Sequence, residues 1–132
     1  MGRQIGRFEI IRELGRGSQS VVYLARDPHL QREVAIKTLH LSPPDPEKNR
    51  QLLSEARLVS QLRHANIVPI FEAGEEGGDL YLVFEYVSGT TLSDLIRKQG
   101  RQTALKAIEI IRPVLDALAH AHAAGIIHRD IK

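Results

Sequence analysis

The order of its predicted elements, strands first and helices later, most constrains what this chain can fold into. Short β-branched or alternating runs, separated by turn residues, predict five strands over residues 8–14, 21–26, 33–39, 67–72 and 80–86. The short connections between the first three runs favour antiparallel pairing. The first half of the chain therefore predicts an antiparallel sheet.

Helical spacing of apolar residues appears in three places. A helix over about 47–62 follows the proline-rich break at 42–46 and carries Leu52, Ala56, Val59 and Leu62 on one stripe. Helices over 91–98 and about 103–123 follow, the longer one with Ile108, Ile111, Leu115, Leu118 and His122 on one stripe. The complete pattern predicts an α+β fold, in which a five-stranded sheet with one helix precedes a helical region.

Composition excludes several classes of protein. The chain has 132 residues, 42% of them hydrophobic, which suits one soluble domain. No apolar stretch approaches the length of a membrane span, and the first residues lack a signal-peptide core, so we expect a cytoplasmic location. The absence of cysteine excludes disulfides and thiolate metal sites, and the six histidines show no ligand spacing, so no metal ligands are predicted. A net charge of only +2, without a Lys/Arg run, argues against nucleic-acid binding.

A glycine-rich segment, Gly15-Arg16-Gly17-Ser18-Gln19-Ser20, lies between the first two predicted strands. Glycine at Gly15 and Gly17 would let the backbone approach phosphate oxygens that a Cβ would block. Taken alone, the segment fits equally well a Gly/Ser hairpin turn without a function.

Lys37 has an unusual place in the third predicted strand. Alternation puts it on the same face as Ala35 and Leu39, where a buried ammonium needs a partner. Glu55 lies between Leu52 and the following apolar positions of the predicted helix, so we expect it inside the apolar stripe and paired with Lys37, directly or after a small helix rotation. The alternative is that Lys37 extends to solvent and Glu55 is an ordinary exposed helix residue.

The chain ends on His128-Arg129-Asp130-Ile131-Lys132. Together with the glycine-rich segment, Val34-Ala35-Ile36-Lys37 and Glu55, in this order, the sequence from Phe8 onward resembles a eukaryotic-like, bacterial Hanks-type serine/threonine protein kinase. The resemblance implies a kinase small lobe at 1–84, a hinge at 85–90 and the start of the large lobe at 91–132, ending inside the catalytic loop. It also implies ATP as cofactor and protein Ser/Thr hydroxyls as acceptors.

The resemblance assigns a role to each matched position. Lys37, held by Glu55, would contact the α- and β-phosphates of ATP, Phe84 would be the gatekeeper, and Ser20 replaces the third glycine of the family pattern. Glu85 would offer its carbonyl and Val87 its N–H to the adenine. The implied ATP-binding residues are Leu14, Gly15, Gly17, Ser20, Val22, Ala35, Lys37, Phe84, Glu85 and Val87. Asp94 fits a ribose contact or an ordinary surface helix equally well.

The same resemblance makes Asp130 the residue that accepts the proton of the substrate hydroxyl and Lys132 a contact of the γ-phosphate. Arg129 suggests an activation loop docked by a phosphate-binding arginine. A C-terminal helix cap is the alternative for this His-Arg-Asp sequence.

The family's following asparagine, Asp-Phe-Gly and Ala-Pro-Glu segments do not occur in these 132 residues, so the expected Mg²⁺ ligands are absent from them. We therefore expect the N-terminal part of a kinase domain that is inactive by itself, with a truncated large lobe. The alternative function is a short, inactive kinase-like interaction module. An uncovered apolar stripe at 103–123 also predicts self-association.

Overall fold

The computed structural model describes residues 2–128 and divides the chain into two compact units. The first unit comprises the residues up to Gln61 together with Val68–Tyr86. The second comprises Leu62–Ile67 and the residues from Val87 onward. The sheet and the first helix belong to the first unit, and the two later helices belong to the second.

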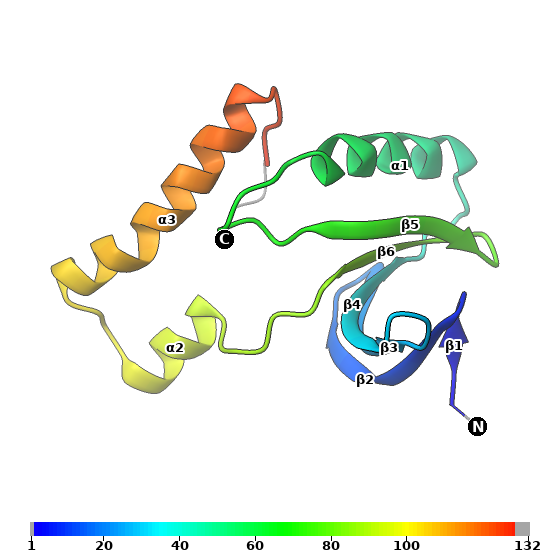
Figure 1. Cartoon of the computed structure of the whole chain (residues 1–132), viewed down its shortest axis with the longest axis horizontal. Helices are drawn as coiled ribbons and strands as arrows, with labels where there is room; N and C mark the ends of the chain where they lie inside the picture. The colour runs from blue at the N-terminus through cyan, green and yellow to red at the C-terminus, as the bar shows by residue number, and fades with distance from the viewer. Residues whose placement is uncertain (1, 129–132) are drawn as a thin grey trace. The chain divides into compact units, whose positions relative to one another are not determined.

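The first unit is built on a six-stranded antiparallel sheet in the order β1-β2-β3-β4-β6-β5 (Figure 1). The strands are β1 (Gln4–Ile5), β2 (Phe8–Arg16), β3 (Ser20–Asp27), β4 (Arg32–Leu39), β5 (Ile70–Glu76) and β6 (Asp79–Glu85). Five of them confirm the predicted strands. The sixth, β1, was missed because two residues are too short to show alternation.

The connection between β5 and β6 is tighter than predicted. Pairing continues to Glu76 and Asp79, so only Gly77 and Gly78 form the turn. Their φ angles of 61° and 85° are left-handed, a combination that glycine adopts without steric cost and that suits two-residue hairpins. The predicted turn at 74–79 is therefore mostly strand.

The main buried cluster lies on one face of the sheet. Alternate residues of β3, β4 and β6 point to this face and are almost inaccessible to solvent. The buried cluster consists of Ile5, Phe8, Tyr23, Ala25, Val34, Ile36 and Val83. The sheet thus encloses its own apolar side chains with little help from helices.

The two edges of the sheet are joined by the turn between β1 and β2. The Gly6 N–H donates to the carboxylate of Glu76 at 3.1 Å, and the guanidinium of Arg7 donates to Glu72 at 3.0 Å. Tyr81 fills the space beneath, since a Cβ on Gly74 would come within 2.7 Å of its ring. These contacts connect β5, at one edge of the sheet, to the β1–β2 turn at the other edge.

Arg7 also binds the buried Asp27 at 3.3 Å. Burial opposes ionisation of Asp27, but the hydrogen bond from Arg7 and those from the backbone N–H groups of Leu30 and His29 outweigh it, so its pKa lies below the usual value. Asp27 is consequently a carboxylate that ties the β3–β4 turn to the sheet edge.

Helix α1 (Pro46–Ser60) packs against β5 and β6 (Figure 1). Asp45 caps it by accepting from the Lys48 N–H at 3.1 Å, and proline at the first position suits a helix start. Asn49 is buried and donates to the Gly78 carbonyl at 3.2 Å. Leu62, predicted as the last residue of this helix stripe, is buried but lies beyond the helix end.

The second unit contains α2 (Leu92–Gln99) and α3 (Ala104–Ala123), capped by the hydroxyls of Thr91 and Thr103. The segment 62–67 belongs to this unit: Asn66 donates to the Pro113 carbonyl at 3.1 Å, and the His64 and His120 rings lie 5.2 Å apart.

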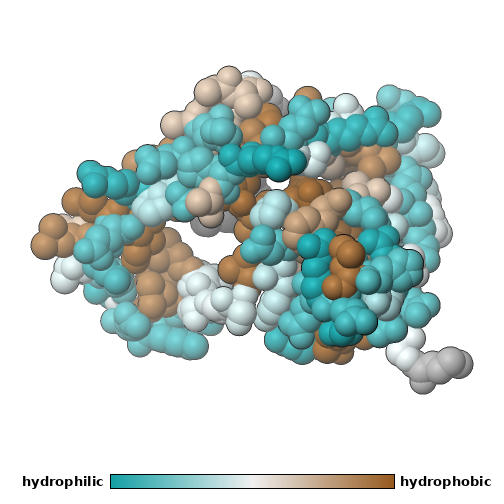
Figure 2. Space-filling model, viewed as in Figure 1, coloured by the Kyte–Doolittle hydropathy of each residue, from teal (hydrophilic) through white to brown (hydrophobic). Residues whose placement is uncertain are grey.

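The apolar stripe predicted on α3 is largely exposed. Ile108, Ile111 and Leu115 are 55%, 40% and 57% exposed, whereas the buried residues of this helix are Ala117 and Ala121. Hydrophobic surface is visible on the helical part of the chain in Figure 2.

Candidate functional site

The face of the sheet opposite the main buried cluster brings together four of the ten predicted ATP-binding residues. Val22 pairs with Lys37, which pairs with Leu82 on the next strand. Two residues along β4, Ala35 pairs with Phe84. Because directly paired residues share a face, these five side chains form two adjacent rows on one surface.

The residues of the candidate site are more accessible than other residues on the same face. Val22, Ala35, Lys37, Leu82 and Phe84 are all half-buried, whereas Leu24 and Leu80, which strand pairing places on this face, are 6% and 0% exposed. The surface is thus apolar and partly open, with one ammonium group among aliphatic neighbours. Leu82 is the member that the sequence analysis missed, although the alternation that places Phe84 on this face also places Leu82 there.

The glycine-rich segment forms the hairpin between β2 and β3, at the end of this surface. Gly15 pairs with Val22, and a Cβ on Gly15 would meet no atom within 4 Å. The Gly17 N–H donates to the Ser20 carbonyl at 2.8 Å and closes the loop. Leu14 is 37% exposed and lies at a register shift between Glu13 and Gly15, so the alternation does not assign it to a face.

Lys37 and Glu55 are not joined in this structure. Among residues 2–128 there is no ion pair between them, and Glu55 is exposed on α1. Placing Glu55 inside the apolar stripe was wrong. The covered face of α1 carries Asn49, Leu52, Leu53, Ala56 and Val59, and Glu55 lies about 100° around the helix from Ala56.

The residues at the end of β6 are divided between the two units. Glu85 is exposed, and its N–H donates to the Pro69 carbonyl at 3.1 Å, so its N–H is not available to a ligand. Val87 belongs to the second unit and is 61% exposed.

Asp94 has an ordinary helical environment. Its N–H is capped by the Thr91 hydroxyl at 3.1 Å, and its carboxylate pairs with Arg97 at 3.0 Å on the surface of α2. These contacts favour the surface-helix alternative for this residue. Arg129, Asp130 and Lys132 lie outside the described residues.

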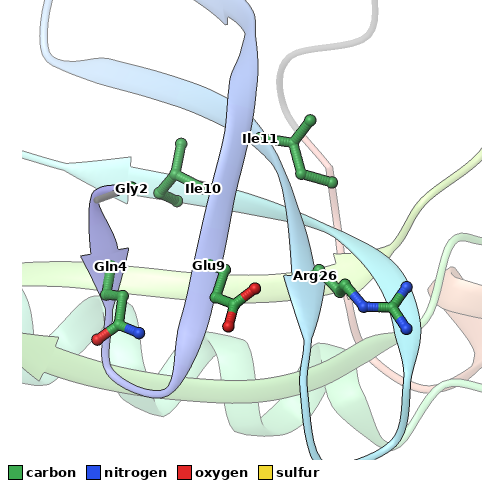
Figure 3. A pocket seen from close by; sticks show the side chains of 6 residues that line it. All are labelled: Gly2, Gln4, Glu9, Ile10, Ile11 and Arg26. Carbon is green, nitrogen blue, oxygen red and sulfur yellow. The ribbon is translucent and has the colours of Figure 1, made fainter.

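A separate hollow of about 480 Å³ lies elsewhere on the first unit, around β1, β2 and β3 (Figure 3). It is lined by Gly2, Gln4, Glu9, Ile10, Ile11 and Arg26. None of these is a predicted ATP-binding residue, and the charged ones, Glu9 and Arg26, are exposed. We therefore assign the candidate site to the surface around Lys37 rather than to this hollow.

Neither a metal-binding cluster nor a membrane-spanning helix occurs in the part of the chain that the structure describes. Residues 2–128 contain no group of three or more His, Asp or Glu side chains arranged to hold a metal ion. Within the same residues, no helix combines the length and hydropathy needed to cross a membrane.

Comparison with known proteins supports the resemblance. The sequence profile of the protein kinase domain matches residues 8–132. The chain is 44% identical to the serine/threonine-protein kinase PrkC of Bacillus subtilis over its whole length, and 41% identical to PknB of Mycobacterium tuberculosis over 96% of it. In each case it spans only 21% of the relative.

A solved kinase structure has a similar fold. The fold superposes on the crystal structure of the Mycobacterium tuberculosis PknI kinase domain with a TM-score of 0.86 at 26% sequence identity. The match covers 99% of this chain and 54% of that one. The chain therefore belongs to the protein kinase family and is related to its bacterial serine/threonine kinases.

Proposed function

We propose that this chain is the ATP-binding portion of a serine/threonine protein kinase, which transfers the γ-phosphate of ATP to protein Ser/Thr hydroxyls. The observation that carries the proposal is the shared surface of Val22, Ala35, Lys37 and Phe84 beside a glycine hairpin. The proposed division is a small lobe at 1–84, a hinge at 85–90 and the start of a large lobe at 91–132.

The surface fits the two ends of a nucleotide. Val22 and Ala35 would contact the flat adenine with half-buried aliphatic groups, and the ring of Phe84 would limit the depth of the pocket. Glu85 would accept a hydrogen bond from the adenine through its carbonyl, and Val87 would donate through its N–H.

Lys37 lies one row nearer the hairpin than Ala35, so its ammonium would meet the phosphates. Leu14 would cover the base from the β2 strand. Gly15 and Gly17 would let the backbone N–H groups of the hairpin approach the phosphate oxygens.

Glu55 would join this site only after a change in α1. In the present structure it is exposed, while Lys37 is half-buried. We propose that rotation of α1, or a new side-chain rotamer, brings the Glu55 carboxylate to Lys37 in the active kinase. An ion pair would then hold the ammonium against the α- and β-phosphates.

Catalysis would depend on the last residues of the sequence. Asp130 would accept the proton of the substrate hydroxyl, and Lys132 would contact the γ-phosphate. The Mg²⁺ ions that accompany ATP in kinases would neutralise phosphate charge, but these 132 residues contain no Asp-Phe-Gly segment to hold one. We therefore propose that the 132-residue chain binds ATP but transfers phosphate very poorly.

Nucleotide binding tests the site. The ammonium of Lys37 would contact phosphate and not the nucleoside, so we expect Lys37→Ala to weaken ATP and ADP binding about tenfold or more, with little change for adenosine. Lys48→Ala, which removes an exposed lysine of α1, is the matched control and should change neither. Isothermal titration calorimetry would contradict the proposal if the wild-type chain bound neither ATP nor adenosine, and would then favour an interaction module.

A phosphate-transfer assay tests the second part of the proposal, that the 132-residue chain transfers phosphate very poorly. With ATP, Mg²⁺ and a generic basic protein, we expect incorporation of radiolabelled phosphate at the level of a control without the chain. Turnover near the ordinary kinase range of roughly 1–100 s⁻¹ would show that the 132 residues suffice for catalysis.

We also propose that the isolated chain self-associates through α3. Its exposed apolar side chains, Leu105, Ile108 and Leu115 among them, would be removed from water in such an assembly. Light scattering should show association that Ile108→Glu with Leu115→Glu removes. A monodisperse wild-type monomer would contradict the proposal.

A further inference from the structure

Ser20 stands where the kinase pattern has its third glycine, and it introduces a hydroxyl at the start of β3. We infer that the Ser20 hydroxyl donates a hydrogen bond to a nucleotide phosphate and makes this chain selective for phosphorylated adenosine. The inference rests on the proposed ATP site and assigns a side-chain contact to a position that in the pattern contributes only backbone.

Strand register places the hydroxyl on the correct face. Ser20 pairs with Leu39, and two residues further along the same strands Val22 pairs with Lys37. Because alternate residues share a face, Ser20 lies on the surface that carries Lys37, at the hairpin end. The intervening residue, Val21, packs against the core on the opposite face.

The hydroxyl is available for a ligand. Ser20 is half-buried, and within residues 2–128 its hydroxyl makes no hydrogen bond, although its backbone carbonyl accepts from Gly17. Thr38 provides the contrast: it lies on the core face of the neighbouring strand, and its hydroxyl donates to the Val21 carbonyl at 3.3 Å. A half-buried donor without a protein partner gains more from an anionic acceptor than a fully hydrated one.

Gly17 leaves room for this hydroxyl. A Cβ on Gly17 would lie 3.0 Å from the Ser20 Oγ, closer than about nine in ten real Cβ contacts. By contrast, a Cβ on Gly15 would meet nothing within 4 Å. Gly17 and the Ser20 side chain are therefore coupled across the loop, and the glycine at this position keeps the hydroxyl where it is.

The test compares adenosine, ADP and ATP binding by calorimetry to the full 132-residue chain. Ser20→Ala should weaken ADP and ATP binding about tenfold and leave adenosine within about twofold, because a hydrogen bond to a charged acceptor is lost only where a phosphate is present. Ser20→Thr keeps the hydroxyl and should bind as the wild type does. Ser18→Ala, which removes an exposed hydroxyl from the loop tip, should change none of the three affinities.

A double-mutant cycle tests whether Gly17 and the Ser20 hydroxyl are coupled. Gly17→Ala should also weaken ADP binding, because its methyl group displaces the Ser20 hydroxyl, but it should weaken binding much less when Ser20 is already alanine. Additive losses would overturn the coupling and with it the assigned position of the hydroxyl.

The outcomes separate the two proposals. If the wild type binds ADP and Lys37→Ala weakens it, but Ser20→Ala does not, the Ser20 contact is overturned and the ATP site stands. An equal loss for adenosine and ADP in Ser20→Ala would also overturn the contact, since it would indicate a damaged loop. If the wild type binds none of the three ligands, the ATP site itself is overturned.

Discussion

The two units of this chain differ in how they treat their apolar side chains. In the first unit the sheet encloses Phe8, Ile36 and Val83 so completely that they are at most 1% exposed. In the second unit α3 leaves Leu105 77% exposed and Leu115 57% exposed. The strands of the first unit were predicted from alternation and α3 from helical spacing, so both predictions rest on apolar periodicity.

The difference teaches that periodicity identifies the apolar face of an element but not whether that face is covered. The strands cover one another's side chains because the sheet is joined at its edges through Gly6 and Arg7. Helix α3 buries only small residues, Ala117 and Ala121. Its large apolar residues present the kind of surface that another protein surface would cover.

The largest expected effect tests this comparison directly. Ile36→Ala removes a fully buried side chain from the sheet core and should lower the free energy of unfolding of the first unit by about 2–5 kcal/mol, through lost burial and a cavity. Urea unfolding followed by circular dichroism measures it. Ile36→Val, a milder change of about 0.5–1.5 kcal/mol, keeps the test usable where the alanine variant does not fold.

Leu115→Ala is the matched change in the second unit. Its side chain is more than half exposed, so we expect the free energy of unfolding to change by no more than about 0.5 kcal/mol. A loss as large as that of Ile36→Ala would mean that α3 is covered in solution, which would break the comparison between the units.

The next effect concerns the closure of the sheet. Gly74→Ala would place a methyl group 2.7 Å from the Tyr81 ring, so the ring or the strand must move, and we expect a cost of about 1–3 kcal/mol. Gly15→Ala lies on the same sheet but meets nothing within 4 Å and should cost far less. If the two variants have equal unfolding free energies, Tyr81 does not fill the junction tightly.

Much of the fold could be predicted because strand and helix periods are local properties of the sequence. Alternation in β4 was enough to place Ala35 and Lys37 on one face, which the pairing with β3 and β6 confirms. The joined sheet edges could not be predicted. They depend on Arg7 meeting Glu72, residues 65 positions apart, and no local pattern indicates such a contact.

The candidate site shows the same limit. The position of Glu55 was misjudged because its spacing from Leu52 and Val59 is compatible with the apolar stripe, yet the helix buries Asn49 and Ala56 instead. Which face of α1 is covered depends on its contact with β5 and β6, and this is a tertiary property. The ion pair of Lys37 with Glu55 stays a prediction about the active kinase.

A smaller effect is expected when the N-terminal cap of a helix is removed, and it should stay within the unit that contains the helix. Thr103→Ala removes the hydroxyl that accepts from the Lys106 N–H at 3.2 Å and should cost about 1 kcal/mol. Because α3 belongs to the second unit, we expect faster amide exchange at the start of α3 and no change in the sheet. Asp45→Ala removes the corresponding cap of α1 and should instead speed exchange where α1 contacts β5. Faster exchange in the sheet of Thr103→Ala would show that the units unfold together.

The last expected effect appears only in acid and concerns the carboxylate of Asp27. Burial acts to raise its pKa in the folded first unit, but the hydrogen bonds from Arg7 and from the N–H groups of Leu30 and His29 outweigh burial and lower the pKa. In the unfolded chain an aspartate has a pKa of about 3.9. A group whose folded pKa is the lower one stabilises the fold above the unfolded pKa, and that stabilisation is lost as the pH falls from about 4 through the folded pKa.

Asp27→Asn should therefore flatten the decline of unfolding free energy below about pH 4, measured by urea unfolding at a series of pH values. Its stability at neutral pH should be lower than that of the wild type, since the amide cannot replace the charge opposite Arg7. Asp116→Asn, at an exposed position of α3, removes a carboxylate from the second unit and should leave the acid dependence of the first unit unchanged. An acid dependence identical in Asp27→Asn and the wild type would show that Arg7 and the N–H groups of the β3–β4 turn do not hold Asp27 ionised in solution.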